Sequence, residues 1–483
     1  MMPQILKKKF AILSLSFFCL SNISAQEEKV WTLQACVEQA LSKNISIQQQ
    51  KLTTQSIKAD YFQSKLAGLP SFNGSASNNW QTGFAINPAT NSAQAGVAFR
   101  TNSFGISSTM PIFNGFQTTN NIRLQESNHK ASEKDLEQTK NTISLNVCNA
   151  YLRVLQSLEL KNSAASRIEA TKAQVERQKK MYDLGSSNKS KLLQLKAQYA
   201  SEELQLVNAE NTVSQAYLDL WLLIEIKPEP NNSIVVPSTE QLSVADEPRT
   251  IDAIFEDFSK RSPDVLAAEQ RKRSSEIQNY IVQGQRSPRL SLTGSLSSFY
   301  STQSKSGVGD MIKIPSLVGT GSYNSTDIPV YSMVPVGYSS YVTTPFRDQY
   351  DRNLGSNIGL NLTVPIFNGW SVNTNIQKAN INQQSSKLSE KLTRNNLYRS
   401  VAQSYVDFKS AYKKYDANIQ NLDANKEAFE VADKQFELGA MNMADYLNTK
   451  NSYIRAQADY TQAKFELVFR RKVLDFYSGK PLY

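Results

Sequence analysis

Few side chains in this sequence have the types and spacing that covalent chemistry needs. The single histidine, His129, lies among Gln, Glu, Asn and Lys, where a histidine is most often surface. The sequence has no GxxxxGK(S/T) phosphate loop, no GxSxG nucleophile motif and no Cys/His cluster with metal-ligand spacing. Its many carboxylates form no isolated acid/base pair. We therefore expect no enzyme, no cofactor and no metal site.

The cysteines are too few for a disulfide framework. Cys19 lies in an N-terminal segment that is expected to be removed, which leaves Cys36 and Cys148. A free cysteine in a helical protein usually behaves as a small apolar residue. We interpret Cys36 and Cys148 as buried apolar residues rather than as a bridge.

The charges are spread along the chain rather than clustered. The 53 basic and 43 acidic residues give a net charge of +10. They intermingle in long segments, which is typical of a solvated helical surface, and they form no basic patch of the kind that binds nucleic acid. We expect no nucleic-acid partner.

Two long segments without helix breakers dominate the sequence. After VPIFNG, 69 residues from Trp370 to Leu438 contain no proline or glycine, and 39 more breaker-free residues follow Gly439. This pattern predicts a strand, a helix on the order of 100 Å long, a tight reversal and a returning helix. A glycine three residues after the last apolar position suits the left-handed residue that ends many helices.

The same plan occurs earlier in the chain, so the sequence is an internal duplication. PIFNG at 111–115 matches PIFNG at 365–369, and Leu184-Gly185 matches Leu438-Gly439, both at an offset of 254. Apolar residues between these anchors repeat with near-heptad spacing, as in helices packed as a coiled coil. Upstream the offset is 218: Thr32 matches Thr250, and Pro70 matches Pro288.

The duplication defines the expected organisation. We predict a first repeat over 26–227, a linker over 228–249 and a second repeat over 250–483. Each repeat has helices, a β-hairpin (70–113 or 288–367), a long helix and a return helix. The second hairpin contains 36 extra residues rich in Gly, Pro, Tyr and Ser, which predict a long loop near 301–352 rather than a new domain.

The N-terminus has the pattern of a secretory signal peptide over 1–25. Three lysines precede an apolar run of 11 residues from Phe10 to Leu20, and Ile23-Ser24-Ala25 suits the cleavage site. The run is too short to span a bilayer as a helix.

The hairpins alternate polar and apolar residues with a period of two, most clearly at 103–112, 290–297 and 357–366, and less clearly at 71–81. One interpretation is an antiparallel sheet with one face on a core. The other is a membrane barrel with lipid outside and water inside. Four strands cannot close a barrel, and an open edge in lipid is costly, so the second interpretation needs several copies. Three copies give about 12 strands, within the known range.

The signal peptide, the opening WTLQACVEQALSKN, the two PIFNG turns and the two Leu-Gly reversals together resemble the TolC family of outer-membrane efflux proteins. The resemblance covers essentially the whole mature chain. It implies a mainly helical homotrimer in which four β-strands per subunit form a 12-stranded barrel, in contact with outer-membrane lipid and continuous with a long periplasmic α-helical barrel. The long helices would be 116–184 and 370–438, and the shorter ones 45–66, 186–226, 263–285 and 440–478.

The resemblance also implies a function and two kinds of site. The protein would be the passive exit duct of a tripartite efflux or type I secretion system in a Gram-negative bacterium, coupled through a periplasmic adaptor to an inner-membrane pump. The adaptor would dock on the reversals, which comprise Leu184, Gly185, Ser186, Leu438, Gly439 and Ala440. Family members place two aspartates at a periplasmic gate, where this sequence has Asp445 and Asn448.

Two alternatives stay open at this point. A lone Asp in the first turns of a helix is often only a solvated residue that the helix dipole favours, so Asp445 has a structural interpretation as well as a gating one. The chain as a whole also fits an exported coiled-coil scaffold or adhesion protein without a pore.

Overall fold

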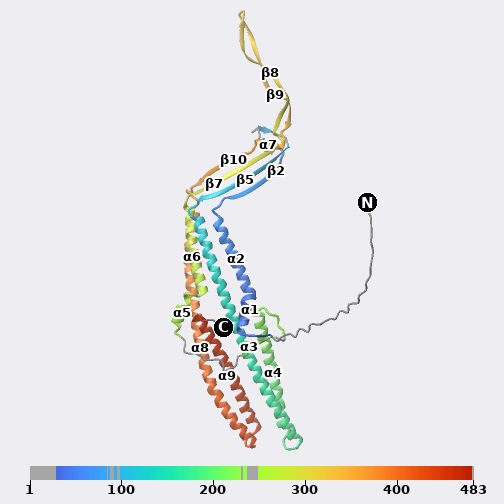
Figure 1. Cartoon of the computed structure of the whole chain (residues 1–483), viewed down its shortest axis with the longest axis vertical. Helices are drawn as coiled ribbons and strands as arrows, with labels where there is room; N and C mark the ends of the chain where they lie inside the picture. Colours follow the sequence, from blue (N-terminus) through green and yellow to red (C-terminus); the bar gives the residue numbers. More distant parts are fainter. Residues whose placement is uncertain are drawn as a thin grey trace, which may run out of the picture. The chain divides into compact units, whose positions relative to one another are not determined.

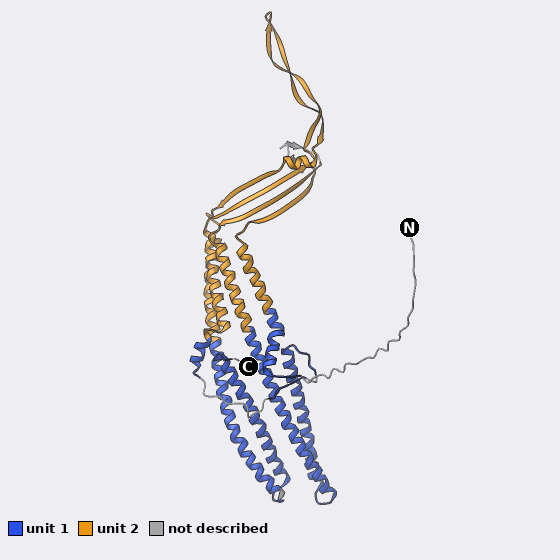
Figure 2. Ribbon diagram, viewed as in Figure 1, with its two compact units in different colours: residues 1–49, 139–258, 397–483 blue, residues 50–138, 259–396 orange. Residues whose placement is uncertain are grey.

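The computed structural model describes residues 29–83, 85–87, 92–94, 98–229, 232–236 and 249–480. The expected signal peptide, with Cys19, lies outside the described residues. The chain divides into two compact units (Figure 2), of which unit 1 comprises 1–49, 139–258 and 397–483, and unit 2 comprises 50–138 and 259–396. Each unit is described by itself.

Unit 2 contains a four-stranded antiparallel sheet in the order β10-β7-β5-β2 (Figure 1). Its strands are β2 (Ser71–Gln81), β5 (Phe99–Phe113), β7 (Arg289–Ser301) and β10 (Gly355–Thr363). The prediction of four strands is confirmed, and the weakly alternating segment 71–81 forms a full strand. Val364 and Ile366, which were expected to extend the last strand, lie beyond its end. A short hairpin, β3 (Ala85–Asn87) and β4 (Ser92–Gln94), follows β2.

The sheet has one polar and one largely apolar face. Because side chains alternate along a strand, the odd-numbered residues of all four strands share a face up to the register shift after Pro111, and this face is mostly Ser, Thr, Asn and Gly. The other face carries most of the large apolar residues, and many of them are exposed. On that face Ile106 lies opposite Leu296, and Leu292 lies opposite Leu360. The sheet is therefore amphipathic although neither of its faces is fully covered.

The strand register reproduces the duplication. In the first hairpin Ser71 pairs with Thr109. Adding 218 to the first residue and 254 to the second gives Arg289 and Thr363, which pair in the second hairpin. Both offsets read from the sequence therefore hold in space.

The helices of unit 2 follow the order of the strands. They are α2 (Ile45–Leu66), α3 (Gln117–Asp183), α6 (Pro263–Gln283) and α8 (Ser371–Glu437), within two residues of the predicted bounds, and parts of α2, α3 and α8 belong to unit 1. A short 3-10 turn, Gly284–Arg286, follows α6.

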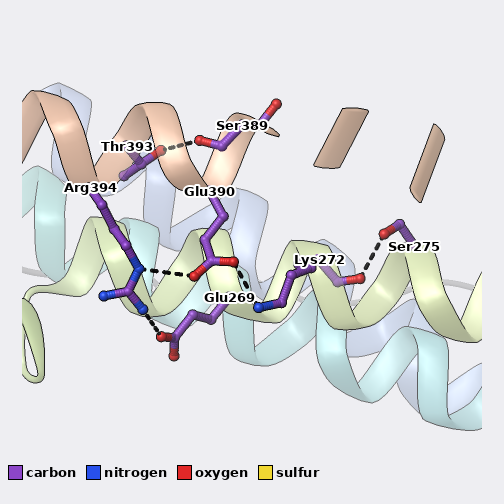
Figure 3. A network of polar contacts seen from close by, with 7 residues as sticks. All are labelled: Glu269, Lys272, Ser275, Ser389, Glu390, Thr393 and Arg394. Carbon is purple, nitrogen blue, oxygen red and sulfur yellow. Dashed lines mark hydrogen bonds and ion pairs between the residues drawn. The ribbon is translucent and has the colours of Figure 1, made fainter. Parts of the chain in front are cut away.

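Polar contacts join neighbouring helices of unit 2. Thr54 Oγ1 of α2 donates to Ser132 O of α3 at 3.2 Å, and Ser127 Oγ of α3 donates to Gln270 O of α6 at 3.0 Å. Helices α6 and α8 are joined through Glu390 (Figure 3), which accepts from Lys272 Nζ at 2.7 Å. The lateral order is therefore α2-α3-α6-α8, which matches β2-β5-β7-β10.

The same carboxylate, Glu390, also accepts from Arg394 Nε at 3.0 Å, and Arg394 reaches Glu269 on α6 (Figure 3). The hydrogen bond from Lys272 is the main reason that the pKa of Glu390 is lowered, and the same bond raises the pKa of Lys272. This network of two cations and two carboxylates links α6 to α8.

The segment predicted as a long loop is folded, so that prediction was wrong. It forms β8 (Lys305–Tyr323) and β9 (Thr326–Thr343), followed by α7 (Phe346–Arg352). Asn324 and Ser325 both have positive φ and form the two-residue turn that matches the twist of paired strands. The frequent Gly and Pro suggested a loop, but this ribbon accommodates them in a ladder with three register shifts. The buried amide of Gln349 bonds the backbone of Ser301, which anchors α7 to β7.

Unit 1 contains the rest of α3 and α8 with α1 (Leu33–Lys43), α4 (Lys189–Leu223), α5 (Ile251–Ser259) and α9 (Met443–Tyr477). Thr32 caps α1, and its side chain accepts from the N–H of Ala35. The core of unit 1 is built from the apolar stripes of these helices. Its almost fully buried side chains include Val147, Val154, Leu220, Val401 and Leu474.

A small parallel sheet in unit 1 was not predicted. It pairs β1 (Lys29–Trp31) with β6 (Asn232–Ile234), which lies within the expected linker 228–249. Tyr151 of α3 donates to the backbone oxygen of Val235 at 2.6 Å just beyond β6. Strands of three residues are too short for their alternation to be recognised in a sequence.

Cys36 and Cys148 are free and buried, which confirms their interpretation as apolar residues. Burial raises the pKa of the Cys36 thiol to about 12 and that of Cys148 to about 11. In the part of the chain that the structure describes, no helix is both long and apolar enough to cross a membrane.

Candidate functional site

The two helical reversals of unit 1 have the same backbone geometry. At the first, Gly185 has φ +73°, its N–H donates to Tyr182 O at 2.9 Å, and the N–H of Ser186 donates to Met181 O at 2.9 Å. At the second, Gly439 has φ +72°, and the N–H groups of Gly439 and Ala440 donate in the same pattern at 3.1 and 2.8 Å. Both are Schellman motifs, which bond otherwise unpaired carbonyls at a helix end.

The reversals present an apolar side chain beside each glycine. Leu184 is 83% exposed and Leu438 is 84% exposed. No heavy atom lies within 4 Å of a Cβ built on Gly185 or Gly439, so the need for glycine comes from φ alone.

Each returning helix begins at an asparagine cap that sequence reasoning missed. Asn188 Oδ1 accepts from Lys191 N–H at 3.0 Å, and Asn442 Oδ1 accepts from Asp445 N–H at 2.9 Å. The two caps are 254 residues apart. An Asn three residues after each Gly was the available signal, because Asn is among the preferred N-cap residues.

The structure places the expected gate residues in the first turns of α9. Asp445 and Asn448 are both exposed. The Asp445 carboxylate accepts a hydrogen bond from the side-chain amide of Asn442, so each of the two residues holds the other in place at the start of α9. This arrangement gives Asp445 a structural role at the N-terminus of α9. Its gating role stays a prediction.

An aromatic cluster braces the second reversal and was also missed by sequence reasoning. The rings of Tyr446 and Phe436 stack with centroids 4.4 Å apart. Tyr446 is buried, and its hydroxyl donates to Asp433 Oδ1 at 3.0 Å. At the first reversal the residues equivalent to Tyr446 and Asp433 are Leu192 and Lys179, which cannot form this bond. The two reversals therefore share a backbone and differ in side chains.

His129 lies beside Tyr61, with ring centroids 6.1 Å apart, and its Nδ1 is 3.8 Å from Glu133. Within the described ranges no three His, Cys, Asp or Glu side chains are grouped as metal ligands would be.

A four-stranded amphipathic sheet and duplicated long helices with glycine reversals indicate the class of outer-membrane proteins with long helical extensions. The sequence pattern of the family described as "Outer membrane efflux protein" matches residues 36–224 and 255–479. The chain belongs to this family. The resemblance predicted from the motifs is confirmed, and so are the TolC-like, mainly helical fold with a β-domain and the outer-membrane location with a large periplasmic helical part. The trimeric 12-stranded barrel stays a prediction.

Individual relatives are distant in sequence and similar in fold. The chain is 20% identical to Outer membrane protein TolC of Salmonella enteritidis over 370 residues, which cover 74% of this chain and 65% of that protein, somewhat less than two thirds of its length. The CmeC outer membrane channel of Campylobacter jejuni is 19% identical with a TM-score of 0.72, covering 92% of this chain and 85% of CmeC. The open state of the Neisseria gonorrhoeae MtrE outer membrane channel is 17% identical with a TM-score of 0.68, covering 99% and 97%.

Proposed function

We propose that this protein is the passive exit duct of a tripartite efflux or secretion system. Three copies form the duct, substrates pass through it to the exterior, and the energy comes from an inner-membrane pump coupled through a periplasmic adaptor. The proposal needs a closed wall that one copy cannot provide.

The main support for the proposal is that the sheet and the helices of unit 2 have unpaired edges at corresponding places in the part of the chain that the structure describes. Within the described strands, β2 and β10 each have a partner on one edge only. The adjoining helices α2 and α8 are likewise at the two ends of the lateral order α2-α3-α6-α8. A copy that pairs β10 with β2 of the next copy would pair α8 with its α2 at the same time. Repeating one such contact closes a ring.

The duplication predicts how the copies meet. Inside the chain β5 pairs with β7, and Ser107 lies opposite Ser295. The equivalents at offsets of 254 and 218 are Asn361 of β10 and Ser77 of β2. We expect Asn361 to lie opposite Ser77 of the neighbouring copy. This register keeps the polar face polar, because residues of equal parity stay opposite one another.

The helical layer supports the same contact. Helices α3 and α6 meet inside the chain where Ser127 bonds Gln270. The equivalents are Ile381 on α8 and Leu52 on α2, which are 63% and 64% exposed. Burying this apolar pair between copies would stabilise the ring, at about 25 cal/mol per Å² removed from water.

The first test is assembly and conduction by the full-length protein. We expect it to require detergent for extraction, to run as a heat-sensitive trimer, and to give ion currents in planar bilayers. A monomer that remains dissolved without detergent would contradict the proposal and favour an exported scaffold.

The second test is the predicted register. The double variant Asn361→Cys/Ser77→Cys should give disulfide-linked trimers on mild oxidation. The background is low, because Cys36 and Cys148 are buried with raised thiol pKa values. The matched control, Asn361→Cys/Asn73→Cys, uses the same face but is displaced by four residues, about 13 Å along the strand, and should not cross-link. Equal cross-linking of both pairs would refute the register.

The reversals are the proposed docking site for the adaptor, through Leu184, Gly185, Ser186, Leu438, Gly439 and Ala440. Bulky residues at Gly185 or Gly439 should leave the trimer yield largely unchanged, because the space around each glycine is open, yet they should abolish export. Normal export by such variants would remove the reversals from the coupling mechanism.

A further inference from the structure

The two reversals carry opposite charge although their backbones match. Between residues 172 and 196 the first reversal has seven basic and two acidic residues, a net charge of +5. The equivalent window, 426–450, has three basic and five acidic residues, a net charge of −2. Equivalent positions even change sign, since Lys179 corresponds to Asp433 and Lys191 to Asp445. The difference is one of surface charge on a shared scaffold.

The basic residues of the first reversal are available to a partner. All seven are exposed, and none takes part in an ion pair described for this part of the chain. They are Lys172, Arg177, Lys179, Lys180, Lys189, Lys191 and Lys196. The second reversal uses part of its charge internally, because Asp433 accepts from Tyr446 and Lys450 Nζ lies 6.0 Å from the ring of Phe429.

Another copy of the chain does not supply enough acid to match this surface. Even if every first reversal met the second reversal of a neighbour, a charge of −2 would face a charge of +5, and each pair would retain +3. Uncompensated positive charge on an exposed turn attracts an acidic surface and raises the rate of association with it.

We propose that the first reversal is the docking surface for an acidic segment of the periplasmic partner, and that the second reversal, with its net charge of −2, does not bind this segment. This inference rests on the proposed function, because it names the chemistry of the adaptor. It makes the two reversals non-equivalent, because the acidic segment binds only the first of them.

The duplication offers matched variants to test this. Lys172 and Lys180 of the first reversal correspond to Lys426 and Lys434 of the second, and all four are exposed. Lys172→Glu/Lys180→Glu and Lys426→Glu/Lys434→Glu change the charge by the same amount in equivalent places. The probe is a fluorescent 20-residue Glu/Ala helical peptide added to the detergent-solubilised full-length protein.

We expect the first double variant to weaken peptide binding at least tenfold and the second to change it less than twofold. Binding to the unaltered protein should fall steeply between 50 and 300 mM salt. Over this range the Debye length shortens from roughly 14 to roughly 6 Å, so the attraction between the charges is increasingly screened. Equal loss in both variants, or no binding of the peptide to the unaltered protein, would overturn the proposal.

A cross-linking measurement tests the partner itself. A photoreactive amino acid replaces Leu184 or Leu438 in cells that contain the native partners. After irradiation, the peptide attached at that position is sequenced by mass spectrometry. We expect an acidic segment from position 184 and a neutral or basic one from position 438. A neutral or basic segment at 184, or a phospholipid, would refute the inference.

The same preparations separate this inference from the proposed function. If trimers form and conduct ions but the two double variants behave alike, only the charge-based docking fails. If no trimer forms and no current is seen, the exit-duct proposal fails first.

Discussion

The positive-φ glycines permit a prediction in which backbone and steric costs are separated. Gly115, in the first PIFNG turn, has φ +66°, and a Cβ there would lie 2.4 Å from the backbone oxygen of Gly284. Gly185 and Gly439 have nearly the same φ but open space around them. Gly284 has φ −59°, so alanine there adds only the close approach to Gly115.

The magnitudes follow from these differences. A left-handed alanine costs about 1 to 2 kcal/mol, and forcing an extra carbon into a packed contact costs about 1 to 3 kcal/mol. Gly185→Ala and Gly439→Ala should therefore lower the free energy of unfolding by about 1 to 2 kcal/mol, and Gly284→Ala by about 1 to 3 kcal/mol. Gly115→Ala combines both terms and should cost about 2 to 5 kcal/mol.

The assay is denaturant unfolding of the detergent-solubilised protein, followed by the helical circular dichroism signal, with the slope checked for each variant. The reasoning fails if Gly185→Ala or Gly439→Ala costs as much as Gly115→Ala. It also fails if Gly284→Ala is neutral, because the 2.4 Å approach would then not be a real constraint.

Four further predictions concern other parts of the chain. The network around Glu390 stabilises the fold at pH values above the ordinary pKa of the carboxyl group, and this contribution is lost as the pH falls through the lowered pKa of Glu390 in the folded state. Glu390→Gln should therefore lower the free energy of unfolding by about 1 to 2 kcal/mol at pH 7 and flatten the acid side of a profile of stability against pH. Lys272, with a raised pKa, stabilises below its ordinary pKa and loses this contribution as pH rises through the folded value, so Lys272→Met should flatten the alkaline limb. If three copies of Asp445 face the channel axis, Asp445→Ala should change single-channel conductance or cation block. Asn442→Ala should mainly destabilise the start of α9. Unchanged conductance in Asp445→Ala would leave Asp445 with its capping role alone. Replacing 305–343 by Asn-Gly should preserve trimers, because Thr344 N–H already bonds Ser304 O at 2.8 Å, and loss of trimers would show that the ribbon is part of the assembly.

The regular parts of the fold were predictable because their signals are long or repeated. The absence of helix breakers over 69 residues and the Leu-Gly reversals fixed α8 to within a residue at each end. The two sequence offsets, 218 and 254, then predict strand pairing, as the equivalence of Ser71–Thr109 with Arg289–Thr363 demonstrates. Duplication supplies long-range information that a single copy lacks.

The misses have a common cause, which is that local composition competes with tertiary context. Gly and Pro between β7 and β10 indicate a loop, yet the segment pairs with itself as β8 and β9, whose apolar side chains are largely exposed. The parallel pair β1 and β6 joins residues about 200 positions apart, and nothing local in Lys29–Trp31 announces it. Both elements depend on pairing rather than on propensity.

At the site, the glycines were predictable and the capping network was not. Gly185 and Gly439 have positive φ, and their position just after a long apolar stripe predicts this helix-ending conformation directly. The reciprocal contact between Asn442 and Asp445 needs two side chains to be oriented together, so a sequence alone leaves a solvated acid, a cap and a gate as alternatives.

The contrast between conserved geometry and diverged charge follows from what a reversal requires. A Schellman turn constrains one residue, the glycine, and an N-cap constrains one more, the asparagine. Positions such as 179 and 191 make no backbone contact that depends on their charge, so Lys can become Asp at 433 and 445 without changing the turn. A duplicated scaffold can therefore keep two identical reversals and still offer two different surfaces. A ring of Asp445 at the axis would then act beside an equal number of Lys191, and the field at the channel end would depend on which of these two positions lies nearer the pore.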